Sequence, residues 1–143
     1  MSRQKFLAKA SSRPTPQTYT IDPQVARKDP LLFGFKHLDL RKGKFICDSG
    51  DGGSLVYILQ TLCLFSKIER MNLERNYPQC HLVPDDQVKK HNLHTIVAIS
   101  NNGRVHQLGR RDTPERIVGY FDSPMTNLFQ ICLLDLRHNL SGN

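Results

Sequence analysis

The feature that most limits the possible folds of this chain is a series of β-type segments in its C-terminal half. Four runs are rich in β-branched and large apolar side chains, at residues 95–99, 104–108, 116–121 and 129–136. Asn102 and Gly103 stand between the first two runs, and this dipeptide favours a tight hairpin turn. Residues 122–127 are turn-rich and link the last two runs. This half therefore predicts consecutive antiparallel strands.

One long amphipathic helix is predicted ahead of these strands. Its apolar residues recur at the spacing of one helical face: Leu55, Ile58, Leu59, Leu62 and Phe65. Ser54 follows a glycine-rich loop at residues 49–53, and its hydroxyl is placed to cap the first turn. We expect the helix to continue to Arg70, because basic residues suit the negative end of the helix dipole.

Shorter elements complete the expected order. Residues 33–38 alternate large apolar and other residues, which predicts a strand with Phe33 and Phe35 on one face. Residues 44–47 predict a second short strand, and residues 84–90 predict a short helix with acidic residues first and basic residues last. The order predicts an α+β fold in which the main helix packs on an antiparallel β-meander.

The net charge of +7 over 143 residues is unevenly distributed. Residues 1–30 hold +4 of it and contain few bulky apolar groups, so they predict an extended, flexible basic arm. Residues 31–143 hold the remaining +3 and predict a single α+β domain. A basic excess of this kind favours phosphate-bearing partners.

The cysteine pattern and the N-terminal sequence predict a cytoplasmic location. Cys63 and Cys132 lie inside apolar runs, where a reduced cysteine acts as a small hydrophobe, so we expect no disulfide framework. The N-terminal sequence has no apolar stretch of signal-peptide length, and no run approaches the length of a membrane span. We therefore expect no membrane partner.

Three possible chemical sites are weakly supported. The loop at residues 49–53 lacks the Lys-Ser/Thr ending of a nucleotide-binding loop and contains Asp51, which repels phosphate. Cys47, beside Asp48, is the only cysteine expected in an exposed loop, and a reactive cysteine needs surroundings that stabilise a thiolate. Four metal-ligating side chains lack the usual spacing of zinc ligands: Cys80, His81, His91 and His94. We expect no metal and no cofactor.

The most distinctive constellation lies on the predicted strands and at their ends. It consists of basic and aromatic residues: Arg104, His106, Arg110, Arg111, Arg116, Tyr120, Arg137 and His138. Alternation puts Arg104 and His106 on one strand face, and likewise Arg116 and Tyr120. Gathered on one exposed sheet surface, these groups would suit RNA, because arginine binds phosphate and aromatic rings stack on bases. An ordinary solvated face is the alternative, because acidic residues are interspersed.

Residues 116–120 and 129–140 resemble the closing hairpin of the RelE/HigB-like superfamily of small basic toxin ribonucleases. In that family a strand containing arginine is followed by an apolar strand that ends in a short polar stretch with histidine or arginine. The order of a helix followed by a meander is also similar to the family. The resemblance implies metal-independent cleavage of RNA, in which a 2′-hydroxyl attacks its own 3′ phosphate.

The resemblance also implies roles for individual residues. Arg116 would hold the scissile phosphate, and His138 would be the catalytic acid/base group, because imidazole exchanges a proton near neutral pH. The remaining RNA contacts would come from Arg104, His106, Arg110, Arg111, Tyr120 and Arg137.

We therefore expect a small basic RNA-engaging protein, a toxin-like metal-independent endoribonuclease of a microbial defence or toxin–antitoxin system. An antitoxin or a complex subunit is its expected protein partner. A second interpretation stays open: a non-enzymatic protein of phage–host conflict that acts by binding another macromolecule, as an inhibitor or a defence-complex subunit. A third is a ribonucleoprotein subunit whose arm runs along RNA. No motif fixes an activity by itself.

Overall fold

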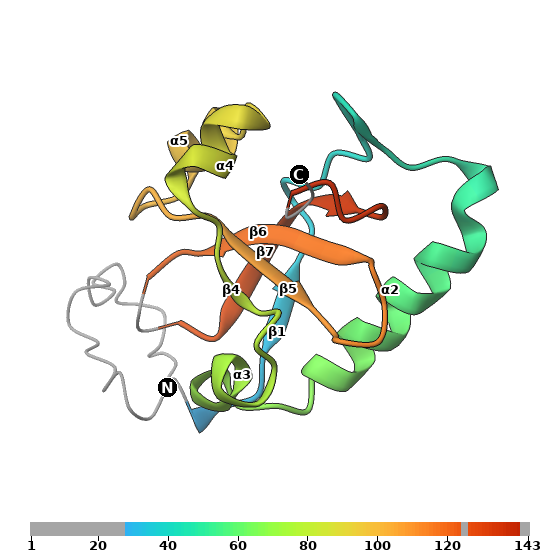
Figure 1. The fold of residues 1–143 in the computed structure, drawn as a ribbon. Helices are drawn as coiled ribbons and strands as arrows, with labels where there is room; N and C mark the ends of the chain where they lie inside the picture. Colours follow the sequence, from blue (N-terminus) through green and yellow to red (C-terminus); the bar gives the residue numbers. More distant parts are fainter. Residues whose placement is uncertain (1–27, 124–125, 141–143) are drawn as a thin grey trace, which may run out of the picture.

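A five-stranded sheet forms the centre of the protein, in the order β1-β7-β6-β5-β4 (Figure 1). The structure is a computed structural model that describes residues 28–123 and 126–140. The strands are β1 (Leu32–Gly34), β4 (His81–Leu82), β5 (His106–Gly109), β6 (Arg116–Phe121) and β7 (Leu128–Asp135). Neighbouring strands are antiparallel except for β1, which runs parallel to β7. The expected α+β class is confirmed, whereas nearly all of the predicted arm lies outside the described residues.

Short helices and one small hairpin surround this sheet. The helical elements are the 3₁₀ turn η2 (Ser49–Asp51) and the α-helices α2 (Gly52–Phe65), α3 (Arg70–Asn76), α4 (Asp85–Lys90) and α5 (His94–Ile99). Strands β2 (Arg41–Lys42) and β3 (Phe45–Ile46) form a separate antiparallel hairpin. In the part of the chain that the structure describes, no helix has the length and apolar character needed to cross a membrane.

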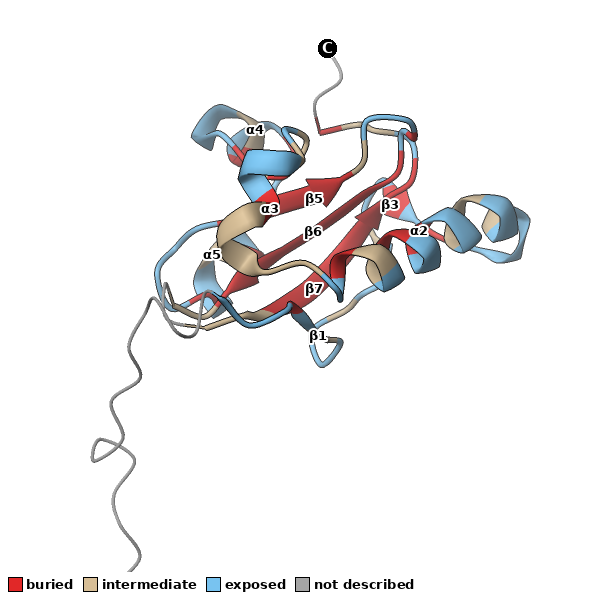
Figure 2. Ribbon diagram, turned by 90° about the horizontal axis from the view of Figure 1, so that it is seen from below, coloured by how far each residue is buried: buried red, intermediate tan, exposed pale blue. Residues whose placement is uncertain are grey.

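One face of the sheet, here called the α2 face, is covered by α2 and α3 (Figure 2). Ile58 and Phe65 of α2 and Leu73 of α3 are buried against the strands. The strand residues on this face alternate with those on the other: Leu108, Ile117, Phe121, Phe129, Ile131 and Leu134. The main helix thus packs on the meander formed by β5, β6 and β7, as the sequence predicts.

The opposite face, here called the α4 face, is covered by α4, α5 and the β2–β3 hairpin. The covering residues are Phe45, Val88, Leu93, Ile96 and Leu140, and the strand residues beneath them are Val118, Tyr120, Cys132 and Leu133. Because both faces are covered, the central strands are buried throughout (Figure 2). The sheet therefore separates the side chains of β6 into two groups that point in opposite directions.

A β-bulge shifts the register between β6 and β7. Val118 is opposite Leu133, and Gly119 is opposite Ile131, so Cys132 is the additional residue. The Cys132 carbonyl accepts a hydrogen bond from the Asp39 backbone N–H at 2.9 Å instead of extending the ladder. A Cβ atom added at Gly119 would lie 1.9 Å from the backbone oxygen of Gln130. The close approach of the two strands therefore requires glycine at position 119.

The prediction of a strand at residues 95–99 is wrong, because this segment belongs to helix α5. Leu93 and Ile96 are both buried in the core of the α4 face, and helical spacing brings them to the same side. Burial of these side chains overrides the β-propensity of the isoleucine and valine residues. Gly103 does have a positive φ of 68°, and Asn102 accepts a hydrogen bond from the Arg104 N–H, but this turn joins a helix to a strand.

Two other element boundaries differ from the prediction. Helix α2 begins at Gly52 with Asp51 at its N-cap position and ends at Phe65, so Ser54 is not the cap and Arg70 starts the next helix. The preceding turn η2 is capped instead by Asp48, whose side chain accepts from the Gly50 N–H. Leu59 was expected on the buried face of this helix but is 61% exposed.

Strand β1 ends at Gly34, well before the predicted residue 38. The Leu38 N–H donates to the Phe35 carbonyl in a turn, and Phe35 is exposed whereas Phe33 packs against Phe129. The remaining predictions are confirmed with small shifts: β3 at residues 45–46, α4 at 85–90, β5 at 106–109, β6 at 116–121 and β7 at 128–135.

We predict that Gly119→Ala destabilises the protein by at least about 1–3 kcal/mol, because the new methyl group would overlap backbone that cannot move without breaking the β6–β7 ladder. Gly53→Ala is the matched control. It lies in the first turn of α2 with nothing within 4 Å of its added Cβ, so it should be neutral or stabilise by up to about 1 kcal/mol. Urea unfolding of both variants measures the difference, and equal midpoints would contradict the role given to the bulge.

Candidate functional site

A group of polar side chains lies on the α4 face at the end of the sheet where β6 begins and β7 ends. We call it the His–Arg cluster, and its members are His81, Gln107, Arg116, Asp135 and His138. The register explains this grouping, because residues opposite one another in an antiparallel pair project to the same face. His81 is opposite Gln107, and Arg116 is opposite Asp135.

Arg116 is the buried cation of this cluster, with only 4% of its surface exposed. One terminal nitrogen, Nη1, donates to the carbonyls of Thr113 at 2.6 Å and Glu115 at 2.9 Å. The side chain lies flat over Gly109, where an added Cβ would be 2.3 Å from the Arg116 Cδ. Its Nε is buried without a hydrogen-bond partner among the described residues. The guanidinium is therefore held in place as a fixed positive charge.

Asp135 orients the segment that carries His138. Its carboxylate is fully buried and accepts the backbone N–H groups of Asn139 at 2.8 Å and Leu140 at 2.9 Å. These bonds close a tight turn after β7, in which His138 has a φ of +57°. This left-handed conformation is uncommon for histidine and more readily adopted by asparagine or glycine. The turn directs the chain so that Leu140 is buried in the core of the α4 face.

Arg116 and His138 lie within electrostatic range of each other, and their predicted catalytic roles stay a prediction. Burial lowers the pKa of His138 below its ordinary value of 6.5, and the positive charges of Arg116 and His81 lower it further. Asp135 acts in the opposite direction. The His138 imidazole is therefore mainly neutral at pH 7, and it can accept a proton.

His81 is a second imidazole beside this pair, with a defined tautomer. Its Nδ1 lies 2.8 Å from the Leu82 carbonyl, which can only accept, so Nδ1 carries the proton. Its Nε2 lies 3.3 Å from the side-chain nitrogen of Gln107, which also donates to the Gln79 carbonyl at 3.2 Å. The amide therefore donates to the lone pair of His81 Nε2. The sequence places His81 only among possible zinc ligands and gives no sign of its contact with Gln107, because the two-residue strand β4 that brings them opposite each other has no periodic signal.

Two of the predicted RNA contacts are buried inside the protein. His106 is opposite Gly119 and projects to the α2 face, where its ring is 5.3 Å from that of Phe121. Tyr120 shares the α4 face with Arg116 as predicted, but it is only 1% exposed, and burial raises the pKa of its hydroxyl. The predicted surface with both rings open to a base is therefore not formed in this structure.

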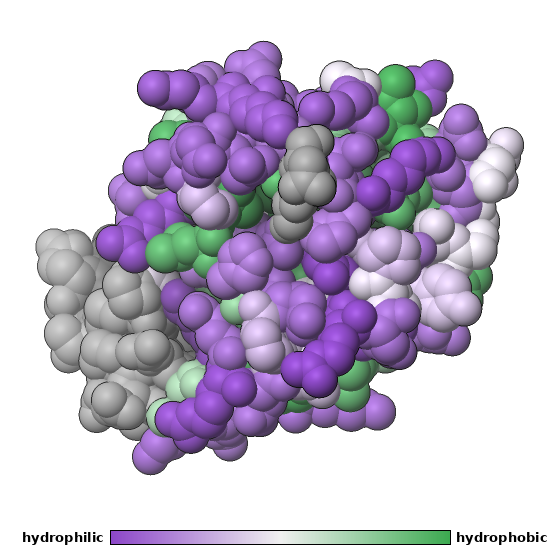
Figure 3. Space-filling model, in the orientation of Figure 1, coloured by the Kyte–Doolittle hydropathy of each residue, from purple (hydrophilic) through white to green (hydrophobic). Residues whose placement is uncertain are grey.

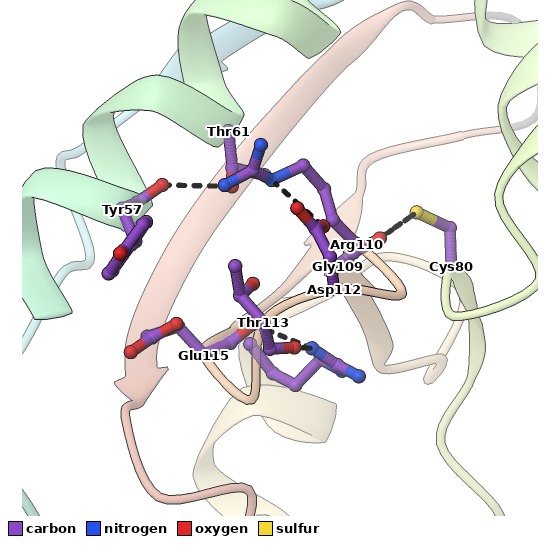
Figure 4. A network of polar contacts seen from close by, with 9 residues as sticks. Tyr57, Thr61, Cys80, Gly109, Arg110, Asp112, Thr113 and Glu115 are labelled. Atoms are coloured by element: carbon purple, nitrogen blue, oxygen red, sulfur yellow. Dashed lines mark hydrogen bonds and ion pairs between the residues drawn. The ribbon is translucent and has the colours of Figure 1, made fainter.

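The other predicted contacts are not members of the His–Arg cluster. Arg104 is exposed beyond the start of β5, and Arg137 makes an ion pair of 2.9 Å with Asp51. Arg110 is 4.0 Å from Asp112 at the β5–β6 turn, near the contact between Cys80 and Gly109 (Figure 4). Arg110 and the exposed Arg111 line a hollow of about 450 Å³ together with Tyr77 and Gln79.

The cysteines and the possible zinc ligands give no further site. Cys47 was expected in an exposed loop but is buried, and this burial raises its thiol pKa. Burial also raises the pKa of Cys80 to about 12 and that of Cys132 to about 11. Across residues 28–123 and 126–140, no group of three or more histidine, cysteine, aspartate or glutamate side chains is placed to hold a metal ion.

We predict that protonation of His106 destabilises the fold at acidic pH. Burial lowers its pKa from 6.5 to about 4, with Arg70, Arg104 and His81 adding to the effect. The unfolded chain therefore binds this proton first as the pH falls below 6.5, and stability is lost progressively down to pH 4. The loss from this group amounts to about 3 kcal/mol.

The comparison of the wild type with His106→Leu by urea unfolding between pH 7 and pH 4 isolates this contribution. The leucine variant should lose less stability over that range, because the side chain that must remain unprotonated in the fold is absent. Parallel pH profiles for the two proteins would show that His106 is not responsible.

We also predict that Asp135→Ala costs about 2–4 kcal/mol, because it leaves the buried N–H of Leu140 and the part-buried N–H of Asn139 without an acceptor. Asp135→Asn keeps one oxygen and should cost less. Asp112→Ala is the control, since its side chain is 74% exposed and the ion pair with Arg110 is long. Thermal and urea unfolding measure all three, and a cost for Asp135→Ala as small as that of the control would contradict this role.

Comparison with known proteins identifies no relative of this chain. No family model, curated protein or solved structure matches it. The resemblance to RelE/HigB-like toxins accordingly stays a prediction. In the His–Arg cluster, two imidazoles lie near a buried guanidinium at one end of the sheet.

Proposed function

We propose that this chain engages RNA and cleaves it without a metal ion, in the manner of a toxin-like endoribonuclease. The observation that carries the proposal is the convergence of His81, Arg116 and His138 on one face of the sheet. Cleavage by the 2′-hydroxyl needs a base for that hydroxyl, an acid for the leaving oxygen and positive charge near the phosphate. The cluster contains side chains that can take each of these roles.

His138 is the proposed base. In its neutral form it takes the proton of the 2′-hydroxyl while that oxygen forms a bond to the adjacent phosphorus. The bond from phosphorus to the 5′ oxygen breaks, and that oxygen takes a proton from Nε2 of His81, which in this step is protonated and has given up its contact with the Gln107 amide. The products are a 2′,3′-cyclic phosphate and a free 5′-hydroxyl. The two imidazoles then carry the reverse protonation, which solvent exchange restores.

Arg116 supplies positive charge that is fixed before the substrate arrives. Because it is nearly buried and hydrogen-bonded to two carbonyls, it requires little reorganisation as negative charge develops on the phosphate. Removing this charge should therefore affect the rate of the chemical step more than the affinity for RNA.

A second candidate function is binding of a protein partner without catalysis, as an inhibitor or a complex subunit. The observation that favours it is the outer side of α2, a helix without charged residues. Val56, Tyr57 and Leu59 on this helix are each about half exposed or more, at 52%, 47% and 61%.

We predict that His138→Asn lowers the rate of RNA cleavage by roughly 100-fold or more, because it removes the proton acceptor. Asparagine tolerates the positive φ of this position, so the turn should persist. Arg116→Gln should lower kcat with a smaller change in KM. His94→Asn is the matched control, an exposed histidine at the start of α5. Initial rates on labelled single-stranded RNA in EDTA measure these effects.

The pH profile tests the same assignment. Because the pKa of His138 lies below 6.5, kcat/KM should fall on the acid side only below that pH, as the base becomes protonated. Unchanged cleavage in both His138→Asn and Arg116→Gln would show that the cluster is not the active site. If the folded wild type cleaves no RNA in EDTA, the binding function is favoured instead.

A further inference from the structure

A basic groove lies between the β2–β3 hairpin and the end of α4. It has a volume of about 360 Å³, and its charged lining consists of Lys42 and Lys44 from the hairpin and Lys90 from the helix. Phe45 and His91 also line the groove, and their rings are 6.0 Å apart. Among the described residues that line it, none is acidic. The groove is therefore a concave site with three cationic groups and positive potential.

Local backbone geometry creates this shape. Gly43 has a φ of +56° and allows the tight turn between β2 and β3, which places lysines on both sides of the turn. Asn92 also has a φ of +56° and ends the helical stretch after α4. The hairpin and α4 flank the C-terminal turn at the top of Figure 1, and hydrophilic side chains cover the α4 region in the matching view of Figure 3.

His91 at the wall of the groove has an unsatisfied polar atom. The residue is only 8% exposed, and its Nε2 lies 3.1 Å from the side-chain oxygen of Gln87. Since that oxygen can only accept, Nε2 carries the proton and Nδ1 has a lone pair. This Nδ1 is buried without a hydrogen-bond partner among the described residues. Buried polar atoms are rarely left unpaired in native proteins, so this Nδ1 lacks the partner that a native structure ordinarily supplies.

Several charged groups act on this imidazole. Burial lowers the pKa of His91, and Lys44 and Lys90 lower it further, whereas Asp135 raises it. A bound phosphate would offset the two lysines and favour the protonated form of the imidazole. Phosphate binding in the groove would therefore be coupled to proton uptake by His91.

The groove and the His–Arg cluster are on the same side of the sheet. Phe45 of the hairpin and the strand residues Val118 and Leu133 belong to one core on the α4 face. Asp135 acts on both His91 and His138, so the two sites border the same buried carboxylate. A strand of RNA bound at the cluster can thus extend toward the lysines.

We propose that this groove is a phosphate subsite for single-stranded RNA, in which Lys42, Lys44, Lys90 and His91 hold a backbone phosphate away from the scissile one. This inference rests on the proposed function for its choice of RNA as the ligand. Lysines contribute point charges that tolerate any base sequence, so the subsite increases affinity without selecting a sequence.

The first test is binding of a short 2′-O-methyl oligoribonucleotide by the full chain at several salt concentrations. This probe has no free 2′-hydroxyl, so binding is measured without cleavage. The double variant Lys42→Ala/Lys44→Ala should reduce the slope of log affinity against log salt by about 0.7, the value for the loss of one phosphate contact on a single strand. Lys28→Ala/Lys67→Ala is the control. Both lysines are exposed, lie near the start of β1 and do not line the groove.

The second test is NMR of the His91 imidazole during titration with inorganic phosphate. In the wild type the His91 signals should shift and its pKa should rise, and the groove variant should lose both changes. Equal salt slopes for the groove and control variants, or His91 signals that do not respond, would overturn the proposal. Loss of affinity for phosphatidylserine vesicles rather than for the oligonucleotide would overturn it in favour of a membrane surface.

These outcomes separate the groove from the proposed cleavage. If the wild type binds the oligonucleotide through the lysines but cleaves no RNA, the groove stands and the catalytic proposal fails. If the wild type cleaves RNA and the groove variant retains the full salt slope, the cleavage stands and the groove proposal fails.

Discussion

The buried carboxylate of Asp135 is the interaction on which the site depends. It lies at the end of β7 opposite Arg116, and it accepts two backbone N–H groups from the turn that follows. A buried charge is costly unless it is paired and hydrogen-bonded, so its neighbours are constrained together. Through this one group the end of the sheet, the conformation of His138 and the burial of Leu140 are linked.

The two faces of the sheet hold polar side chains in different surroundings. On the α2 face, His106 is enclosed with Phe121, and burial lowers its pKa to about 4, so it contributes to core packing as a neutral ring. On the α4 face, apolar residues of α4, α5 and the β2–β3 hairpin cover the middle of the sheet. The His–Arg cluster lies on the same face, at the end of the sheet where β6 begins. His106 and Gln107 thus have different surroundings, because adjacent positions along β5 project to opposite faces of the sheet.

The basic character of the described protein is local. Arg137 is paired with Asp51 and Arg116 is buried, so neither contributes strongly to an open surface. The lysines at the β2–β3 hairpin and at the end of α4 instead surround one groove. Although the net charge is modest, three positive charges are concentrated in one groove, because the fold brings a hairpin and a helix end together on the α4 face.

The sequence by itself determined the α+β class and the strands around Arg116 and residue 133, because long periodic runs indicate which residues are buried. Only the tertiary structure decided that residues 95–99 are helical, that His106 and Tyr120 are buried, and that His81 and Gln107 join the cluster. These outcomes depend on strand register and on packing between segments distant in sequence. Local propensity contains no information about either, since a shift of one residue reverses the face of every side chain.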